Sequence, residues 1–296
     1  MSQPKTLYLV DASIYVFRAY FSLPESITDP EGNPVNAVYG FSTFLHQLLT
    51  QTRGSHYAVA FDASLTSSFR NKIYPHYKAN REPAPDELKL QFTHCQTMTR
   101  ALGLATFSSK RYEADDLLGT VAKQLRQEGF KMVIVTGDKD LSQLLDAGDT
   151  FWDYSRQRKL TSKTAADHFG VKPSQMVDLL ALMGDSIDNI PGVPGIGQKT
   201  AVTLLSRFRN LDNIYRNLDK IPQLPLRGSQ RVANLLTEHK DSAYLSKRLA
   251  TIVDTVPLRC SSHRLKKQPV NTRRVNNLCN KLGFGEGLRQ RLLALT

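Results

Sequence analysis

Nine acidic residues stand in this sequence at places where they could act together. They follow expected strands, open an expected helix or lie in a glycine-flanked turn: Asp11, Asp62, Glu113, Asp115, Asp116, Asp138, Asp140, Asp185 and Asp188. A single Asp after a strand or at a helix start is usually a turn or cap residue. Three expected strands that each run into an acid are harder to explain in that way, so we expect the nine carboxylates to converge.

Converging carboxylates need cations. Like charges at close range raise one another's pKa, so the acids cannot all stay ionised without compensation. A site of carboxylate oxygens without His suits Mg²⁺, and Mn²⁺ is an expected substitute. Two such ions about 3.5–4 Å apart can hold the attacking and leaving oxygens of an in-line phosphoryl displacement. The pattern therefore predicts a two-ion site that hydrolyses phosphodiester bonds.

The charge balance points to a polyanionic partner. The 296 residues include 39 Lys and Arg against 27 Asp and Glu, a net charge of +12. Residues 247–296 contribute eleven of these cations and only two of the acids. Such an excess favours nucleic acid or an anionic membrane as the partner. An acidic pocket in a basic protein fits a metal-dependent nuclease, because the surface attracts the nucleic-acid backbone and metals make the pocket tolerable to it.

Cysteine usage and the absence of long apolar runs limit where the protein acts. Cys95, Cys260 and Cys279 are too few and too far apart for a disulfide or zinc framework. The apolar run Leu7–Val10 is too short for a secretory leader, and no stretch of about 18 apolar residues follows. We therefore expect a cytoplasmic protein with free thiols and no membrane partner.

A glycine-rich segment, residues 191–201, is a second candidate for binding phosphate. It fails the P-loop pattern because Gln198 stands where Lys is needed, and the GxGxxG fingerprint because Thr200 takes the third glycine position. What remains is a turn between two helices. Backbone N–H groups at the start of the second helix could bind a phosphate there, with Lys199 adding a charge. An ordinary helix–helix turn fits the spacing equally well.

Cations and aromatic rings alternate between the second expected strand and the acidic helix start. Tyr74, Tyr77, Lys78 and Arg81 have helical spacing, so they share one face if a helix begins at Pro75. Rings that stack on bases, beside cations that hold phosphates, are typical of proteins that bind single-stranded nucleic acid. A solvated helix face is the alternative. The expected contacts here and in the first helix are Arg18, Arg70, Tyr77, Lys78 and Arg81.

The elements that must position these residues alternate between strands and helices. Thr6–Val10, His56–Phe61 and Met132–Val135 are predicted to be buried strands, and Ile14–Phe21 and Val35–Leu49 helices. This order predicts an α/β domain with a central, mostly parallel sheet flanked by helices.

The texture of the sequence changes after about residue 165. Short helical runs then alternate with Gly/Pro turns, which predicts a smaller helical domain. We divide the chain into residues 1–165 and 166–296, the second part including the basic C-terminal segment. Residues 261–272 are expected to be a mobile linker.

With these residues in view, the sequence resembles the 5′-nuclease family. This family includes the 5′–3′ exonuclease domain of bacterial DNA polymerase I, phage flap endonucleases and stand-alone exonucleases of the exonuclease IX type. The resemblance extends to about residue 290. It is carried by Asp11-Ala-Ser, Tyr39-Gly-Phe, Phe61-Asp62, Phe69-Arg70, Tyr77-Lys78-Ala-Asn-Arg81, Tyr112-Glu-Ala-Asp-Asp116, Thr136-Gly-Asp-Lys-Asp140 and Met183 to Lys199.

The resemblance implies a PIN-like fold with a helical arch and a helix-three-turn-helix that grips duplex DNA, with a bound K⁺. It implies a structure-specific 5′–3′ exonuclease and flap endonuclease in replication and repair. The expected substrates are DNA with 5′ ends or flaps, and RNA primers in addition. We expect a monomer, with polymerase and ligase as separate chains.

The resemblance also implies roles for individual residues. One metal would lie among Asp11, Asp62, Glu113 and Asp115. The other would lie among Asp138, Asp140, Asp185 and Asp188, with Asp115 or Asp116 between the two. Lys78 and Arg81 would steer the scissile phosphate, so these two and Asp116 are the expected catalytic residues. The DNA-gripping turn would contain Gly192, Gly195, Gly197 and Lys199.

Two other function classes stay open at this point. A DNA-binding module without catalysis would lack some of the carboxylates, and none is missing. A small-molecule phosphatase with Asp11 as nucleophile usually has a second Asp two residues on, where Ser13 stands. The one departure from the family pattern is Ile187, where a small polar residue is usual, and it leaves the acids untouched.

Overall fold

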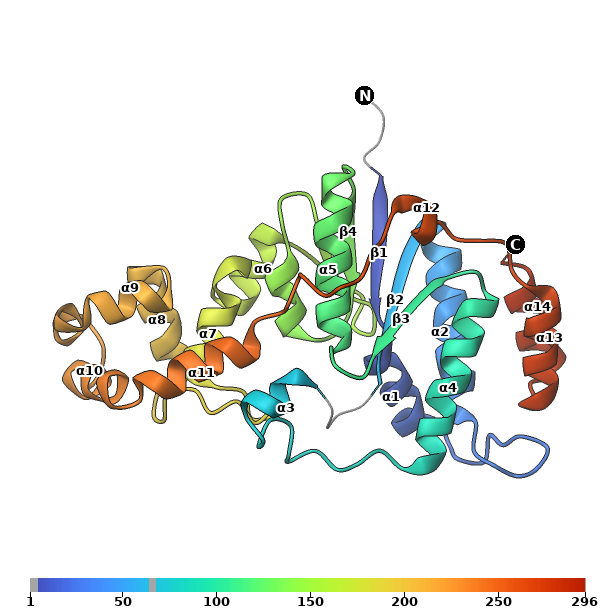
Figure 1. Cartoon of the computed structure of the whole chain (residues 1–296), viewed down its shortest axis with the longest axis horizontal. Coiled ribbons are helices and arrows are strands. Elements are labelled where there is room, and N and C mark those ends of the chain that lie inside the picture. Colours follow the sequence, from blue (N-terminus) through green and yellow to red (C-terminus); the bar gives the residue numbers. More distant parts are fainter. Residues whose placement is uncertain (1–4, 64–67, 296) are drawn as a thin grey trace.

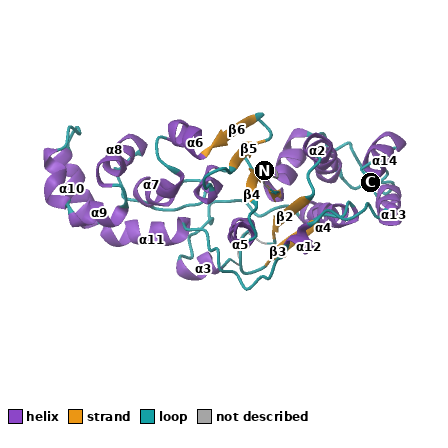
Figure 2. Ribbon diagram, turned by 90° about the horizontal axis from the view of Figure 1, so that it is seen from above, coloured by secondary structure: helices purple, strands orange, loops and turns teal. Residues whose placement is uncertain are grey.

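The protein, described here by a computed structural model covering residues 5–63 and 68–295, is built around one sheet. The described residues form six strands in the order β3-β2-β1-β4-β5-β6, and only β6 is antiparallel to its neighbour (Figures 1 and 2). The strands are β1 Thr6–Asp11, β2 His56–Asp62, β3 Ala105–Ser109, β4 Lys131–Val135, β5 Thr150–Asp153 and β6 Arg158–Thr161.

Helices cover both faces of this sheet. On β1, Val10 belongs to the core under one helical layer, whereas Leu7 and Leu9 belong to the core on the other face. A strand buried on both sides is apolar at nearly every position, as is usual in parallel sheets. The first layer contains α1 Ala12–Ser22, α2 Asn36–Thr52, α4 Asp86–Ala101, α13 Thr272–Lys281 and α14 Glu286–Leu293. The second contains α5 Ala114–Gln127, η1 Lys139–Leu144, α6 Ser162–Phe169 and α12 Ser262–Leu265.

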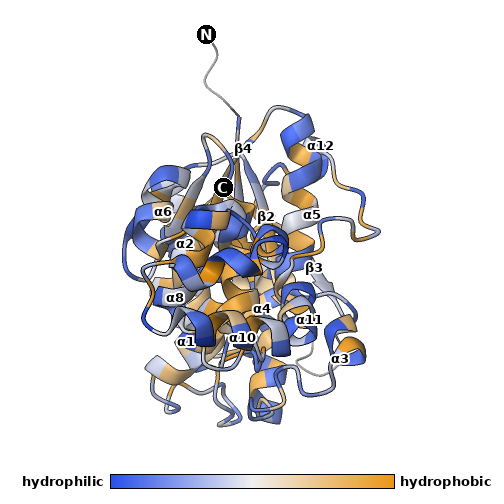
Figure 3. Ribbon diagram, turned by 90° about the vertical axis from the view of Figure 1, so that its left-hand side faces the viewer, coloured by the Kyte–Doolittle hydropathy of each residue, from blue (hydrophilic) through white to orange (hydrophobic). Residues whose placement is uncertain are grey.

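A second, wholly helical half has its own core. In Figure 1 it lies to the left of the sheet, with α13 and α14 at the opposite end of the molecule. In Figure 3 hydrophobic colour is concentrated in the middle of the molecule, around β2 and α4. The elements of the helical half are η2 Pro173–Gln175, α7 Met176–Met183, α8 Gln198–Phe208, α9 Leu211–Arg216, η3 Leu218–Gln223, α10 Ser229–Glu238 and α11 Lys240–Ala250.

The predicted α/β architecture is confirmed, and so are the three predicted strands and the two predicted helices. The strands β3, β5 and β6 were not expected. Each has only four or five residues, and β3 carries three polar residues in Ala-Thr-Phe-Ser-Ser. Such strands give little periodic signal. No helix in the described ranges is long and apolar enough to cross a bilayer. Residues 1–4, which precede the apolar run Leu7–Val10 that we considered as a secretory leader, lie outside the described residues.

Two expectations for the C-terminal part differ from the structure. Residues 261–272 are not a free linker, because Leu265 is fully buried in the sheet core and the Gln268 N–H donates to the Gly103 carbonyl at 2.9 Å. Most of the basic C-terminal segment does not pack with the helical half: Leu249 and Ala250 still belong to that core, but α12, α13 and α14 do not. Val275, Leu278 and Leu292 are buried in the core under α2 and α4. The division of the chain between residues 165 and 166 stays a prediction, but α12, α13 and α14 pack on the α/β half and not on the helical half.

Between β2 and α4 the structure also departs from the expected helix. α3, Phe69–Ile73, ends before Tyr74, whose backbone is extended. The residue before a proline is disfavoured in a helix, and Pro75 follows. Turns continue to Arg81, and Lys78 has a left-handed φ of 56°. The four side chains with helical spacing therefore do not share one helix face.

Candidate active site

A cavity of about 410 Å³ opens at the edge of the sheet where the strands β1, β2 and β4 end. The chain leaves β1 toward β2 and β3 on one side, and toward β4, β5 and β6 on the other, so the cavity lies at the point where the strand order reverses. Ligands of open α/β sheets bind at this point. Eight of the nine predicted acids line the cavity: Asp11, Asp62, Glu113, Asp115, Asp138, Asp140, Asp185 and Asp188.

Short polar contacts fix the acids that follow the strands. The Thr136 hydroxyl donates to Asp11 Oδ2 at 2.9 Å, which joins the ends of β1 and β4. Asp138 caps η1 by accepting the Asp140 N–H at 2.9 Å. The first N–H of α5, on Ala114, donates to Asp62 Oδ1 at 2.9 Å. Asp138 is therefore held by the local turn after β4, whereas Asp11 and Asp62 are held by contacts with segments far away in the sequence.

Asp185 and Asp188 are held in a closed loop between α7 and α8. Asp185 and Ile190 exchange two backbone hydrogen bonds of 2.8 and 2.9 Å. The loop crosses itself at Gly184 and Gly192, where a Cβ on Gly192 would lie 2.2 Å from the Gly184 nitrogen. Only glycine fits there, so these residues fix where the two carboxylates point. Ile187, between the two acids, lines the cavity and is 65% exposed.

Burial and mutual repulsion raise the pKa values of four carboxyls. For Asp11, burial comes first and the charges of Asp62 and Asp138 follow, raising its pKa to about 7. Burial and the charge of Asp138 raise the pKa of Asp140 to about 8. Burial is also the main cause of the raised pKa values of Asp115 and Asp138. The acids thus lie close enough to repel one another strongly.

This donor set fits divalent cations. It offers carboxylate oxygens of the kind that Mg²⁺ prefers. Asp140 Oδ1 is buried and has no hydrogen-bond partner, with the nearest cation, Lys139 Nζ, at 3.6 Å. Within residues 5–63 and 68–295, no three of the acids are arranged so that they could already coordinate one metal ion. Lysine and arginine side chains lie among them instead.

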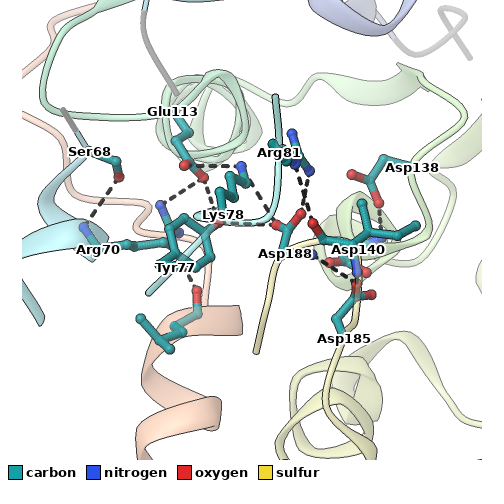
Figure 4. Close-up of polar contacts among 12 residues, drawn as sticks. Ser68, Arg70, Tyr77, Lys78, Arg81, Glu113, Asp138, Asp140, Asp185 and Asp188 are labelled. Carbon is teal, nitrogen blue, oxygen red and sulfur yellow. Dashed lines mark hydrogen bonds and ion pairs between the residues drawn. The ribbon is translucent and has the colours of Figure 1, made fainter. Parts of the chain in front are cut away.

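Three cations line the carboxylate cavity, and Figure 4 shows two of them, Lys78 and Arg81, among the acids. Lys78 Nζ lies 3.1 Å from Glu113 Oε1 and 3.6 Å from Asp188 Oδ2, and Arg81 forms an ion pair with Asp188. The structure thus brings both predicted phosphate-steering residues to the site, although from turns and not from a helix.

Lys139 is the third cation, and it was not singled out from the sequence. Its Nζ lies 2.6 Å from Asp185 Oδ2. Burial alone would raise the pKa of Asp185, but the hydrogen bond and charge of Lys139 lower it overall. The signal was present, since Lys139 stands between two of the nine acids. Thr136 and Ser13 were also missed; the Ser13 hydroxyl accepts the Asp62 N–H at 2.9 Å.

Three residues that the sequence predicted to contact metal or DNA are buried in the structure. Asp116 is fully buried and does not line it. Arg70, expected to contact DNA, is 3% exposed and donates two hydrogen bonds of 2.8 Å to Asp116. Tyr77 is also 3% exposed, and its hydroxyl oxygen lies 3.1 Å from both Glu113 Oε2 and Asp188 Oδ2, so its one proton can be donated to either carboxylate. Burial in this network leaves neither side chain free to contact a base or phosphate.

The remaining predicted DNA contacts lie apart from the carboxylates. Arg18 is exposed and lines a second cavity between α1, α2 and the β5–β6 hairpin. Gly192 is buried, and its N–H donates to the Ser246 hydroxyl at 2.9 Å, so it cannot contact DNA directly. Gly195, Gly197 and Lys199 are exposed at the start of α8, where Gly197 is the N-cap residue.

Comparisons with known proteins found matches along most of the chain. Residues 6–170 match the model of a 5′–3′ exonuclease N-terminal resolvase-like domain, and residues 171–273 that of a 5′–3′ exonuclease C-terminal SAM fold. A 5′–3′ exonuclease of Buchnera aphidicola subsp. Schizaphis graminum is 36% identical over 285 residues, which are 96% of this chain and 99% of the relative. DNA polymerase I of Pseudomonas aeruginosa is 42% identical over 253 residues, which are 85% of this chain but 28% of the polymerase.

Solved structures share the fold at lower identity. A T5 5′-exonuclease with bound zinc ions has a TM-score of 0.66 and 21% identity, with 98% of this chain and 97% of that chain covered. The catalytic core of Rad2 in complex with a DNA substrate has a TM-score of 0.62 and 16% identity, with 99% and 93% covered. These likenesses extend over both halves of the molecule.

Proposed function

Because this chain belongs to the 5′–3′ exonuclease family, we propose that it is a structure-specific 5′–3′ exonuclease and flap endonuclease that cuts DNA with two divalent ions. The observation that carries this proposal is one cavity at the strand-order reversal that eight carboxylates and three cations line. Clustering carboxylates out of water is costly, and neither a DNA-binding module nor a small-molecule phosphatase with Asp11 as nucleophile would require so many of them.

When bound, divalent cations neutralise the phosphate and activate water for hydrolysis. The residues of this chain would hold them in two groups with Asp115 between them, since the charges of Asp11 and Asp62 from one group and Asp138 from the other all act on Asp115. We propose Mg²⁺ as the ion. The first group is Asp11, Asp62, Glu113 and Asp115, and the second is Asp138, Asp140, Asp185 and Asp188.

Lys78 and Arg81 would hold the scissile phosphate where negative charge develops. Both reach the cavity from the turns after α3, and Glu113 and Asp188 hold them in place. Lys78 and Arg81 line the same cavity as Asp11, so a phosphate bound there would lie near these two cations as well as the acids. Preorganised charges of this kind stabilise a transition state without reorganisation at the moment of reaction.

The helical half would grip duplex DNA beside the cavity. α7, the loop 184–197 and α8 give a helix, a series of turns and a helix, as expected for a helix-three-turn-helix. The exposed Gly195, Gly197 and Lys199 lie at the N-terminus of the 11-residue α8, where backbone N–H groups favour a phosphate. A K⁺ ion in this turn is part of the proposal.

The chain spans about a third of the DNA polymerase I relatives that it matches, and nearly all of the Buchnera exonuclease. We propose that it acts as a monomer in replication and repair, in a pathway that also uses a polymerase and a ligase. RNA primers are a further proposed substrate.

Cleavage of a labelled 5′-flap duplex tests the proposed function. With Mg²⁺ we expect products with a 3′-hydroxyl and a 5′-phosphate, and we expect none with chelator. Ca²⁺ should support binding without cutting, since it tolerates looser geometry than Mg²⁺. Tight binding of the flap with no cutting in Mg²⁺ or Mn²⁺ would instead support the DNA-binding module.

A further inference from the structure

Arg70 uses every N–H group that it has. Its Nη1 donates to Asp116 Oδ2 at 2.8 Å and to Glu113 Oε2 at 3.3 Å, and its Nη2 donates to Asp116 Oδ1 at 2.8 Å and to the Thr251 carbonyl at 2.9 Å. The Nε donates to the Leu249 carbonyl at 2.8 Å. A guanidinium has five N–H donors in a fixed planar arrangement, and here all five are satisfied in a buried position.

Asp116 is saturated in the same way. Besides the two bonds from Arg70, its carboxylate accepts the Glu113 N–H at 3.1 Å and the Val253 N–H at 2.8 Å. An ionised carboxylate has about four acceptor positions. Since the side chain is fully buried and all four positions are used, Asp116 has none left for a metal ion.

This buried pair joins three parts of the molecule. Arg70 belongs to α3, and Asp116 lies in the first turn of α5, next to Glu113. The third part is residues 249–253, the return segment, through which the chain passes from α11 in the helical half back to the sheet. Gln143 of η1 also holds the return segment, because its side chain bonds the Ala250 carbonyl at 3.2 Å and the Ile252 N–H at 3.0 Å.

We propose that Arg70 and Asp116 form a strut that sets the position of Glu113, and with it the register between the helical half and the carboxylate cavity. Both are positioning residues, because they act on metal and substrate only through Glu113 and the return segment. This inference rests on the proposed function, in which Glu113 is a metal ligand. It replaces the sequence-based roles of Arg70 as a DNA contact and Asp116 as a metal ligand.

The strut depends on the shape of arginine and not only on its charge. Lysine would keep the positive charge but has three donors on one atom, so it cannot bond Asp116 with two parallel hydrogen bonds while also bonding Leu249 and Thr251. Arg70→Lys therefore separates geometry from charge. Groups that orient a metal ligand typically change metal affinity or activity about 10–100-fold when they are lost.

A matched control exists at the other end of α5. Arg126 pairs with the buried Asp149 and also donates to the Leu144 carbonyl at 2.5 Å, both through Nη2, so another arginine–aspartate pair joins α5 to η1 and the segment after it. It does not line the carboxylate cavity. Arg126→Lys should lower the melting temperature without affecting the site.

The test compares Arg70→Lys, Asp116→Asn, the double variant and Arg126→Lys. Mn²⁺ binding is measured on the DNA-free protein from the EPR signal of free Mn²⁺, and flap cleavage under single-turnover conditions at saturating DNA. We expect Arg70→Lys and Asp116→Asn each to weaken Mn²⁺ binding and cleavage about 10-fold or more. The double variant should lose no more Mn²⁺ affinity and cleavage rate than the more impaired of the two single variants, because the pair acts as a unit. Arg126→Lys should match the wild type in both measurements.

Three results would overturn the strut. The first is a much larger loss for Asp116→Asn than for Arg70→Lys, with the two losses adding in the double variant, which would make Asp116 a ligand. The second is unchanged Mn²⁺ binding in Arg70→Lys. The third is failure of both single variants to fold while Arg126→Lys folds, which would make the pair a folding determinant only. A wild type that binds Mn²⁺ but cuts no flap would remove the proposed function, while the Mn²⁺ comparison would still decide the strut.

Discussion

Replacing Lys78 by Ala should separate catalysis from DNA binding. The ammonium lies 3.1 Å from Glu113 and 3.6 Å from Asp188 at the cavity wall, and its side chain is only 10% exposed. Burial by itself lowers its pKa, but the charges of Glu113 and Asp188 raise the pKa overall, so the side chain stays charged. Loss of one preorganised charge contact typically costs about 3–4 kcal/mol in the transition state, or roughly 10²–10³ in rate.

The folded protein should tolerate this change. Arg70 and Tyr77 still bond Glu113, and Arg81 still pairs with Asp188, so neither acid is left as an isolated buried charge. Duplex contacts through the exposed start of α8 also remain. We therefore expect affinity for flap DNA to change by less than about threefold, which is about 0.65 kcal/mol.

Single-turnover cleavage and equilibrium binding in Ca²⁺, measured on one flap substrate, show whether Lys78→Ala lowers the cleavage rate without lowering the affinity for DNA. Lys163→Ala, which removes an exposed lysine of α6 outside the cavity lining, is the charge-matched control. If Lys78→Ala loses affinity in proportion to its rate, the segment after α3 is a general DNA-holding surface and the reasoning is wrong.

Further outcomes follow from the same structure. Without divalent ions, the free energy of unfolding should fall as pH rises from about 4 to about 8: the folded pKa values of Asp11 and Asp140 are about 7 and about 8, above the unfolded values, so the folded state binds more protons in this window. Millimolar Mg²⁺ should remove this loss of stability. Melting temperatures measured at pH 6 and pH 8, with Mg²⁺ and with chelator, test the expectation. The same pH dependence with Mg²⁺ and with chelator would show that the acids do not cluster as described. Arg81→Ala should also lower the single-turnover rate, since its guanidinium pairs with Asp188, whereas flap affinity should hold. Removal of residues 247–296 should unfold the α/β half, because Val275 and Leu278 are core residues; a truncated chain with native circular dichroism would show that the segment is dispensable.

The sheet and the carboxylates were predictable because their signals are local. Each central strand is a continuous apolar run that ends near an acid, and parallel strands place those ends together. Eight of the nine acids consequently line one cavity. The ninth, Asp116, has the same local pattern as Asp115 on the same helix start. The rotation of the helix sends Asp116 inward to Arg70, and that partner cannot be inferred from spacing.

The segment around Lys78 was harder to predict because tertiary contacts decide its shape. Helical spacing favours a shared face, but the Lys78 N–H donates to the Asp188 carbonyl at 3.0 Å and Asn71 bonds the Tyr77 carbonyl at 2.9 Å. These bonds stabilise turns that direct the Tyr77 ring inward. The C-terminal helices illustrate the same limit, since apolar periodicity predicts that α13 packs but not on which half.

Anomalous scattering from crystals soaked in Mn²⁺ would locate the divalent ions of the cavity directly. We expect two manganese peaks in the cavity, with Asp115 between them, and the loss of at least one peak in Asp138→Asn crystals. Peaks confined to the surface, or a manganese ion bound by Asp116 in place of Arg70, would contradict this expectation.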